Sequence, residues 1–397
     1  MKRICFGILL LFIISLYAQA VDYVGPDFAQ GFYDQYSKNY LNADMVGRGH
    51  TGMALPGGVD YAHHNPAAML DDYSSMILEI AIKARVDEFN DLQNNKYQSN
   101  SPLNSIGFSF APFNNTHFGF SYNLENSLEY NSFERPLPQT DTSVDYKPKY
   151  ANNQILLSFA HELNKHISFG VNGIVNVHSF REYRNEGKVD LISFNKAYYR
   201  IQPGLLYQSE FVNLGASFVH AVDVNYKHKY IDYNMTIPAE LKAGIAIKFN
   251  NDLIVLADTD FTLYSQQAKY MNDQAVFKLG IEKRFENPFI KIGDYSLKLG
   301  FIYSPKIYSG EYNVPNYSSD SLDEFHPNFY NAIPDIGFIK PVDLRLLTIG
   351  TTVRIKNDVQ LNMGYILDTS KDVGLNQLVV SLKFDLAVFN SLKKNLP

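Results

Sequence analysis

Two short stretches near the start of the chain contain residue types that could bind a cofactor or a metal. Gly47, Gly49 and Gly52 form a G-x-G-x-x-G, the pattern with which a strand–turn–helix unit binds a dinucleotide pyrophosphate. His63 and His64 are neighbours, and histidine is a common metal ligand. However, no strand-like stretch precedes the glycines, adjacent side chains on extended backbone point apart, and no third ligand lies at metal-binding spacing. The sequence therefore predicts no cofactor and no metal site.

Hydrolase chemistry is not expected either. The chain contains no G-x-S-x-G nucleophile elbow and no H-E-x-x-H zinc motif. Its single cysteine, Cys5, lies in an N-terminal segment that we expect to be removed, so neither a thiol nucleophile nor a disulfide is predicted. We therefore expect no enzyme activity.

The residues from 45 to 70 are unusually rich in glycine and small side chains. Gly57 and Gly58 follow the three glycines named above, which suits backbone packed closely against other backbone or turning at positive φ. Asn65-Pro66-Ala67 then reads as a turn, because proline fixes its own φ and moves the preceding residue out of the α region. These features predict a compact, densely packed segment.

This run resembles the N-terminal hatch of the FadL family of outer-membrane channels and their PorV-like relatives, which reads roughly G-A-R-x-x-G-M-G-G-A followed by N-P-A. The matching stretch runs from Gly47 to Ala54, with Asn65 to Ala67 as the turn. Two positions depart from the family pattern, since Ala54 and Ala68 stand where glycine is usual. The resemblance implies a hatch in the lumen of a barrel, with these hatch and gating residues: Gly47, Gly49, Gly52, Met53, Asn65, Pro66 and Ala67.

The resemblance also implies two alternative functions. A FadL-like protein would pass a hydrophobic small molecule, such as a long-chain fatty acid, through the bacterial cell outer membrane, with hatch movement opening the path. A PorV-like protein would instead be a docking platform that hands over secreted proteins. The segment 311–341 mixes aromatic and acidic residues and could serve as a lid or as a binding surface for proteins, so the sequence leaves both open.

The N-terminus has the composition of a secretory signal peptide. Lys2 and Arg3 precede an apolar block too short to span a membrane, and Ala18-Gln19-Ala20 ends the segment. Without those two cations, 33 basic residues face 41 acidic ones, which argues against a nucleic-acid partner. We expect a signal peptide at 1–20, a hatch at 21–73, a barrel at 74–389 and a C-terminal extension at 390–397.

Alternating apolar residues predict an all-β chain of fourteen strands. No later stretch approaches the roughly 20 apolar residues of a spanning helix, so a membrane protein of this composition must be a transmembrane antiparallel β-barrel. An even number of strands, each of about 9 to 11 residues, suits a bacterial porin-like barrel. The strands are expected at 74–86, 106–110, 118–124, 155–159, 167–177, a stretch ending near 207, 212–218, 241–249, 253–261, 277–281, 297–303, 347–355, 359–367 and 378–386.

Loop lengths favour this barrel over a soluble β-sandwich. Short connections at Asn114, Asn164, Glu210, Asn250 and Asn357 alternate with long ones, the asymmetry of outer-membrane barrels. The long connections are expected at 87–103, 133–150, 266–273 and 311–341.

If the apolar faces meet lipid, charges of both signs point inward and should pair with each other and with the hatch. Inward positions such as Gly244 and Ser381 should then accept arginine more readily than their lipid-facing neighbours. The charges expected inside are Glu79, Lys83, Arg85, Lys242, Lys248, Asp258, Asp260, Lys278, Glu282, Arg284, Lys298, Lys383 and Asp385.

Overall fold

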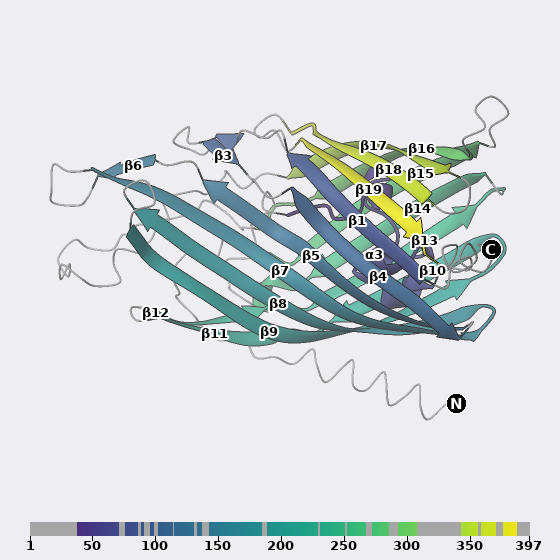
Figure 1. The fold of residues 1–397 in the computed structure, drawn as a ribbon, viewed down its shortest axis with the longest axis horizontal. Coiled ribbons are helices and arrows are strands. Elements are labelled where there is room, and N and C mark those ends of the chain that lie inside the picture. The colour runs from purple at the N-terminus through teal and green to yellow at the C-terminus, as the bar shows by residue number, and fades with distance from the viewer. Residues whose placement is uncertain are drawn as a thin grey trace, which may run out of the picture.

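The computed structural model contains one closed barrel with a short segment inside it (Figure 1). Described residues are 38–70, 76–85, 89–90, 96–98, 102–113, 115–130, 133–136, 143–184, 189–228, 231–250, 252–266, 272–285, 293–307, 343–355, 359–370 and 376–386. The predicted signal peptide, C-terminal extension and segment 311–341 therefore lie outside them. No helix among these residues is long and apolar enough to cross a membrane.

Fourteen antiparallel strands form the barrel wall, as the alternation predicts. Each pairs with its neighbour in chain order, and β1 closes the barrel against β19, from Ile77 opposite Asp385 to Arg85 opposite Gln377. The wall strands are β1 (Met76–Arg85), β4 (Leu103–Phe113), β5 (Thr116–Tyr130), β7 (Ser143–Asn164), β8 (Ile167–Arg184), β9 (Val189–Gln208), β10 (Val212–Val219), β13 (Glu240–Lys248), β14 (Leu253–Thr262), β15 (Gln274–Phe285), β16 (Tyr295–Ser304), β17 (Leu344–Ile355), β18 (Val359–Asp368) and β19 (Gln377–Asp385).

Several strands are longer than expected, and part of one predicted loop is strand. β7, β8 and β9 have 22, 18 and 20 residues. At roughly 3.3 Å per residue they reach well past a hydrocarbon core of about 30 Å. The predicted loop 133–150 holds β6 (Phe133–Pro136) and the start of β7, which pair with each other. β2 (Phe89–Asn90) and β3 (Lys96–Gln98) lie in the predicted loop 87–103.

A separate hairpin was not predicted from the sequence. β11 (Val222–His228) and β12 (Ile231–Ile237) pair only with each other and form a second sheet between β10 and β13. The short turns are as expected where they are described. Asn250 Oδ1 accepts hydrogen bonds from the backbone N–H groups of Asp252 (3.0 Å) and Leu253 (2.7 Å), which closes the turn between β13 and β14.

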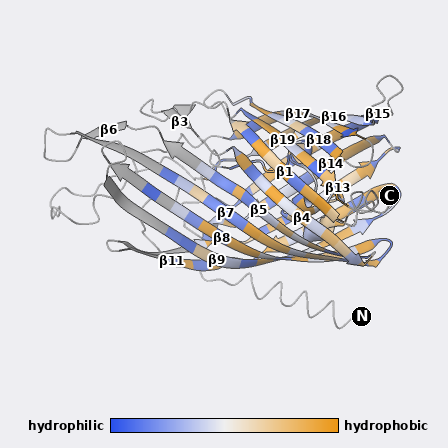
Figure 2. Ribbon diagram, viewed as in Figure 1, coloured by the Kyte–Doolittle hydropathy of each residue, from blue (hydrophilic) through white to orange (hydrophobic). Residues whose placement is uncertain are grey.

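The barrel is apolar outside and polar inside. Leu279, Leu299 and Ile349 expose more than half of their surface on the outer face, while Lys278 and Lys298 on the inner face are almost fully buried. Figure 2 shows that apolar residues of the strands concentrate in the right-hand part of the barrel, around β4, β13 and β14. Large exposed aromatics, Phe113, Phe211 and Phe249, lie near the short turns. This is the pattern expected of a wall that faces lipid, with phenylalanine at the rim in place of tryptophan.

The lumen is filled across part of its length by residues 38–70, here called the inner segment. It contains α2 (Ala43–Gly47), α3 (Val59–Ala62) and the 3-10 helix η3 (Pro66–Met69), and nearly all of its residues are buried. Its apolar side chains pack against wall residues such as Leu206, Ala246 and Leu256. The inner segment therefore lies where the sequence places a hatch.

Candidate functional site: the contact between the inner segment and the wall

Capping and glycine turns fix the path of the inner segment. Asn42 caps α2, since its Oδ1 accepts hydrogen bonds from the N–H groups of Asp44 (2.7 Å) and Met45 (3.1 Å). The chain then reverses through Gly49 and His50, at φ 73° and 55°. Positive φ is costly for most residues but not for glycine, so this corner explains Gly49 directly. The G-x-G-x-x-G is thus a turn inside the barrel and follows a helix instead of a strand.

The Asn65-Pro66-Ala67 turn is tied to both the inner segment and the wall. Asn65 Oδ1 accepts a hydrogen bond from Ala67 N–H (3.1 Å), and Pro66 occupies the first turn of η3, where its missing N–H costs nothing. Asn65 Nδ2 donates to the carbonyl oxygens of Met53 (2.9 Å) and of Leu205 in β9 (3.0 Å). The buried side-chain amide of Asn65 therefore joins η3, the backbone at Met53 and strand β9.

We expect Asn65→Ala to loosen this turn, because the buried carbonyl of Met53 and the partly buried carbonyl of Leu205 each lose a donor. Leaving such groups unsatisfied costs about 1–3 kcal/mol each. Hydrogen exchange of residues 60–70 in the detergent-solubilised protein should accelerate accordingly. Asn164→Ala is a matched control, since Asn164 caps an exposed turn through His166 N–H (2.9 Å) and Ile167 N–H (3.1 Å). Equal exchange of residues 60–70 in both variants would contradict the assignment.

Ten wall glycines bring the inner segment into close contact with the barrel. A Cβ at position 215 would lie 1.9 Å from the carbonyl oxygen of Met53, and one at 300 would lie 2.0 Å from Gly49 N. A Cβ at 170 would lie 2.4 Å from the carbonyl carbon of Pro66. Such distances leave no room for any side chain. We call this set the glycine belt: Gly107, Gly119, Gly170, Gly204, Gly215, Gly244, Gly280, Gly300, Gly350 and Gly364.

The belt corrects one expectation from the sequence. Gly244 was expected to accept arginine because it points into the lumen. A Cβ there would lie 2.6 Å from Met53 Cβ and 2.1 Å from Asp258 Oδ1. Ser381, the other such position, is 2% exposed and accepts a hydrogen bond from Asn362. At this level the inner face is packed as tightly as a protein core, so arginine would not fit.

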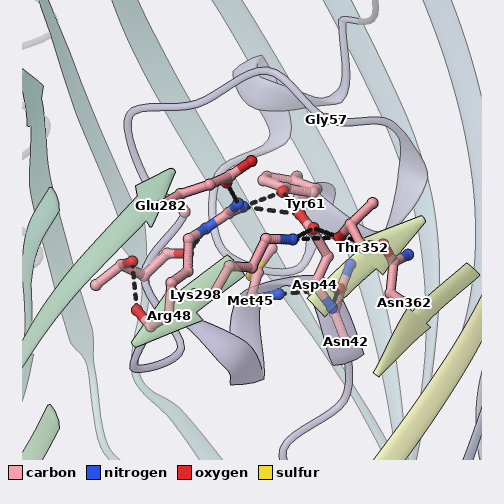
Figure 3. Close-up of polar contacts among 12 residues, drawn as sticks. Asn42, Asp44, Met45, Arg48, Gly57, Tyr61, Glu282, Lys298, Thr352 and Asn362 are labelled. Carbon is pink, nitrogen blue, oxygen red and sulfur yellow. Dashed lines mark hydrogen bonds and ion pairs between the residues drawn. The ribbon is translucent and has the colours of Figure 1, made fainter. Parts of the chain in front are cut away.

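Charged side chains connect α2 to the wall (Figure 3). Arg48 forms ion pairs with Asp44 (2.9 Å) and with Glu282 of β15 (2.7 Å), and its guanidinium also donates to the Tyr61 hydroxyl. Lys298 of β16 pairs with Asp44 from the other side. Burial alone would raise the pKa of Asp44, but Arg48 and Lys298 outweigh burial and hold that pKa well below its usual range.

A second wall carboxylate holds the inner segment by its backbone. Asp258 Oδ2 on β14 accepts hydrogen bonds from the N–H groups of Gly52 (2.7 Å) and Met53 (3.0 Å). Gly52 itself leaves room for the Met45 side chain, whose sulfur would lie 3.0 Å from a Cβ at position 52. Lys383 of β19 donates in turn to the carbonyl oxygen of Gly57 (3.0 Å). The inner segment is therefore held through backbone groups as well as side chains.

The inner segment separates two cavities in the lumen. The larger, about 720 Å³, lies at the end with the short turns, between Arg48 and Tyr61 on one side and rim residues such as Glu210 and Asn250 on the other. The smaller, about 120 Å³, lies towards the opposite end, where β15 begins and β16 ends. We call it the histidine chamber, because His50, His63 and His64 line it.

His63 and His64 do not point apart as the sequence suggested. His63 follows α3 in αR geometry, so the backbone is not extended, and the two rings meet edge to face with centroids 5.2 Å apart. Burial lowers the pKa of His63 to about 3 and that of His64 well below its usual range, so both are neutral near pH 7. Among the described residues no cluster of three or more His, Cys, Asp or Glu could hold a metal ion.

The wall beside the histidine chamber is held partly by side chains. Backbone pairing of β9 with β10 runs only from Gln208 to Gly204 on β9. Beyond it, the Arg200 guanidinium donates to Glu240 Oε1 (2.9 Å) and to the carbonyl oxygens of His220 (3.1 Å) and Pro238 (2.8 Å). One arginine thus bridges β9 to the chain on both sides of the β11–β12 hairpin.

All seven hatch residues expected from the sequence lie in the inner segment, and each contacts a neighbour described above or a belt glycine. Gly47 lies against Gly350 of β17, where a Cβ would come within 2.8 Å of the glycine Cα. The wall side of the contact was not predicted from the sequence. Its signal was present, since Gly170 and Gly244 each stand at an inward position of an alternating strand.

Known structures share this architecture, although no family model and no curated protein matches the sequence. The Ralstonia pickettii toluene transporter TbuX superposes with a TM-score of 0.59 at 14% identity, over 89% of this chain and 99% of its own. The Pseudomonas putida toluene transporter TodX gives 0.59 at 13%, over 92% and 99%. A Pseudomonas aeruginosa FadL homologue gives 0.55 at 12%, over 87% and 98%.

The chain has the fold of the FadL-type transporters. The resemblance predicted from residues 47–54 and 65–67 is thereby confirmed at the level of the fold. The FadL-type structures named above are described as transporters or as a FadL homologue, and not as enzymes, in agreement with the expectation from the sequence.

Proposed function

We propose that the chain is a bacterial outer-membrane channel for hydrophobic small molecules, with the inner segment as its hatch. The observation that carries the proposal is the arrangement of the lumen: a wall apolar outside and polar inside surrounds a segment that lies between two cavities. Exposed leucine, isoleucine and phenylalanine on the outer face support contact with membrane lipid. The FadL-type fold supports a hydrophobic cargo.

In this proposal the closed state is the one described here. Contacts at the glycine belt and the Arg48 ion pairs hold the inner segment against the wall, and passage requires the segment to move. Long-chain fatty acids remain a prediction of the sequence. The docking alternative depended on segment 311–341, which lies outside the described residues, and none of the described contacts favours it.

A reversible crosslink between hatch and wall tests the proposal. Val59 in α3 and Gly107 in β4 suit a cysteine pair, because Val59 Cγ1 lies 2.6 Å from the Cβ position at 107 and the closest atoms there belong to side chains. Cys5, the only natural cysteine, lies in the predicted signal peptide and would not compete. We expect the oxidised double variant to lose most uptake of a hydrophobic fluorescent probe into liposomes, and reductant to restore it.

The single variant Gly107→Cys is the control, since it carries the same wall substitution without a partner. Its uptake should not respond to oxidant or reductant. Unaltered uptake in a double variant shown by gel shift to be crosslinked would exclude gating by the hatch, provided that the probe enters only when the protein is present.

A further inference from the structure

The histidine chamber contains buried polar atoms without a partner. Both ring nitrogens of His50 and the Nδ1 atoms of His63 and His64 are buried and make no hydrogen bond to any described residue. Buried polar groups in proteins almost always have a partner, and an unsatisfied one costs free energy. Each imidazole offers both a donor and an acceptor nitrogen when neutral. The three rings therefore offer free donors and acceptors to a ligand with polar atoms.

Among the described residues that line the chamber, lysine and arginine side chains outnumber carboxylates by one. Glu240 pairs with Arg200 (2.9 Å) and Lys242 (3.3 Å), and Asp260 pairs with Lys278. Glu125 accepts hydrogen bonds from Asn152 (2.9 Å) and Gln154 (3.3 Å). Lys38 also lines the chamber, and no carboxylate lies within ion-pair distance of it among the described residues. Four cations thus face three carboxylates around neutral histidines.

Burial makes the unpaired positive charge of Lys38 unfavourable. The pKa of the Lys38 ammonium is lowered, mainly because of desolvation and also because Lys278 is near. A charge in this environment gains more from a counter-ion than one in water would. A ligand with a single negative charge would balance the chamber.

Apolar and aromatic side chains also line the chamber, beside uncharged polar ones such as those of Asn39, Thr262 and Gln274. Ile237, Val276, Ile302 and Leu344 belong to the apolar side chains, and the ring of Tyr40 meets that of His50 edge to face at 5.0 Å. The volume of about 120 Å³ is close to that of an engineered apolar cavity of about 150 Å³ that binds benzene. A single aromatic ring fits this space, whereas an extended long-chain acid does not.

We propose that the histidine chamber binds a small aromatic mono-anion of the arene carboxylate type. The ring lies against the apolar side and the imidazole faces, and the carboxylate accepts hydrogen bonds from the histidines and the ammonium of Lys38. This inference rests on the proposed channel and gives it a narrower cargo than hydrophobic compounds in general.

Binding to the full-length protein in detergent tests the chamber directly. Titration calorimetry should show saturable binding of benzoate, with toluene, acetate and palmitate each at least tenfold weaker because they lack the charge, the ring or the compact size. Lys38→Met should weaken benzoate binding at least tenfold while retaining the aliphatic chain of lysine. Lys283→Met, on the same barrel but outside both cavities, should leave binding unchanged.

His50→Phe provides a second variant that keeps the volume of the ring and removes its polar atoms, and it should also weaken benzoate binding severalfold. Toluene binding as tight as benzoate binding, no benzoate binding at all, or equal affinity in Lys38→Met and Lys283→Met would each overturn the proposal. No benzoate binding would mean that the chamber holds water only.

Liposome uptake separates this inference from the channel itself. Uptake of toluene without benzoate binding would overturn the chamber proposal and leave the channel standing. Benzoate binding that Lys38→Met weakens, in a protein that admits no probe to liposomes, would support the chamber and exclude the channel.

Discussion

Replacing Gly215 with leucine should displace the inner segment and open the lumen. Position 215 has no room for a side chain, because a Cβ there would lie 1.9 Å from the carbonyl oxygen of Met53 and 2.5 Å from its carbonyl carbon. Overpacking of a core costs about 1–3 kcal/mol when side chains can adjust, and here the obstacle is backbone. We expect the conductance of the variant in planar bilayers to rise severalfold above the closed level of the wild type.

The matched control is Gly173→Leu in β8. Gly173 faces outward, and the only atom near its Cβ position is the carbonyl oxygen of Leu157 at 3.9 Å. This variant should insert and conduct like the wild type. A Gly215→Leu protein that folds into membranes with unchanged conductance would contradict the close fit between the inner segment and the wall.

Arg48→Met should have the second large effect, on the attachment of α2. Arg48 is 2% exposed and bridges two carboxylates, one in the inner segment and one in the wall. Removing one member of a buried ion pair costs about 3–5 kcal/mol, because the remaining charges lose their partner. Hydrogen exchange of residues 42–50 should therefore accelerate by two orders of magnitude or more.

Arg284→Met is the control, since Arg284 also contacts Glu282, at 3.2 Å, but its side chain is 50% exposed. An exposed pair contributes about 0–1 kcal/mol, so exchange in the inner segment should barely change. Similar exchange rates in the two variants would show that the buried position of Arg48 adds nothing to the attachment.

Arg48→Met should also change how acid affects the segment. In the wild type the pKa of Asp44 is depressed. The stability that the ionised carboxylate gives to the inner segment is therefore complete above the ordinary carboxyl pKa and is lost as the pH falls through the lowered pKa. Without Arg48 the Asp44 carboxylate keeps only Lys298 as an ion-pair partner, and its pKa should rise. The stabilisation by the ionised Asp44 carboxylate should then be lost at a higher pH than in the wild type.

The wall was predictable because its signal is local and repeated. Alternation of apolar and polar residues places a strand wherever one face meets lipid, and the predicted count of fourteen is confirmed. Strand ends were less predictable. β7 begins at Ser143 because it pairs with β6 and β8 beyond the apolar band, and pairing of that kind leaves no alternation to detect.

The contact between the inner segment and the wall could be predicted only in part. The sequence located the dense segment and the charges that point inward, including Glu282 and Lys298. It could not show that Gly244 faces the side chains of Met53 and Asp258 instead of open lumen, because Met53 lies almost two hundred positions away along the chain. His63 and His64 were misjudged for a related reason, since an extended backbone was assumed where a helix ends.

The glycine belt also has a consequence for how the barrel is assembled. Side chains alternate between the two faces of a strand, so pairing shifted by one residue turns every belt glycine on that strand towards lipid. In β15 such a shift replaces Gly280 with Leu279 or Ile281 on the inner face, where Arg48 and Thr51 leave no space. Ten of the fourteen wall strands carry a belt glycine, so the inner segment can pack in the lumen as described only when those ten strands are in register.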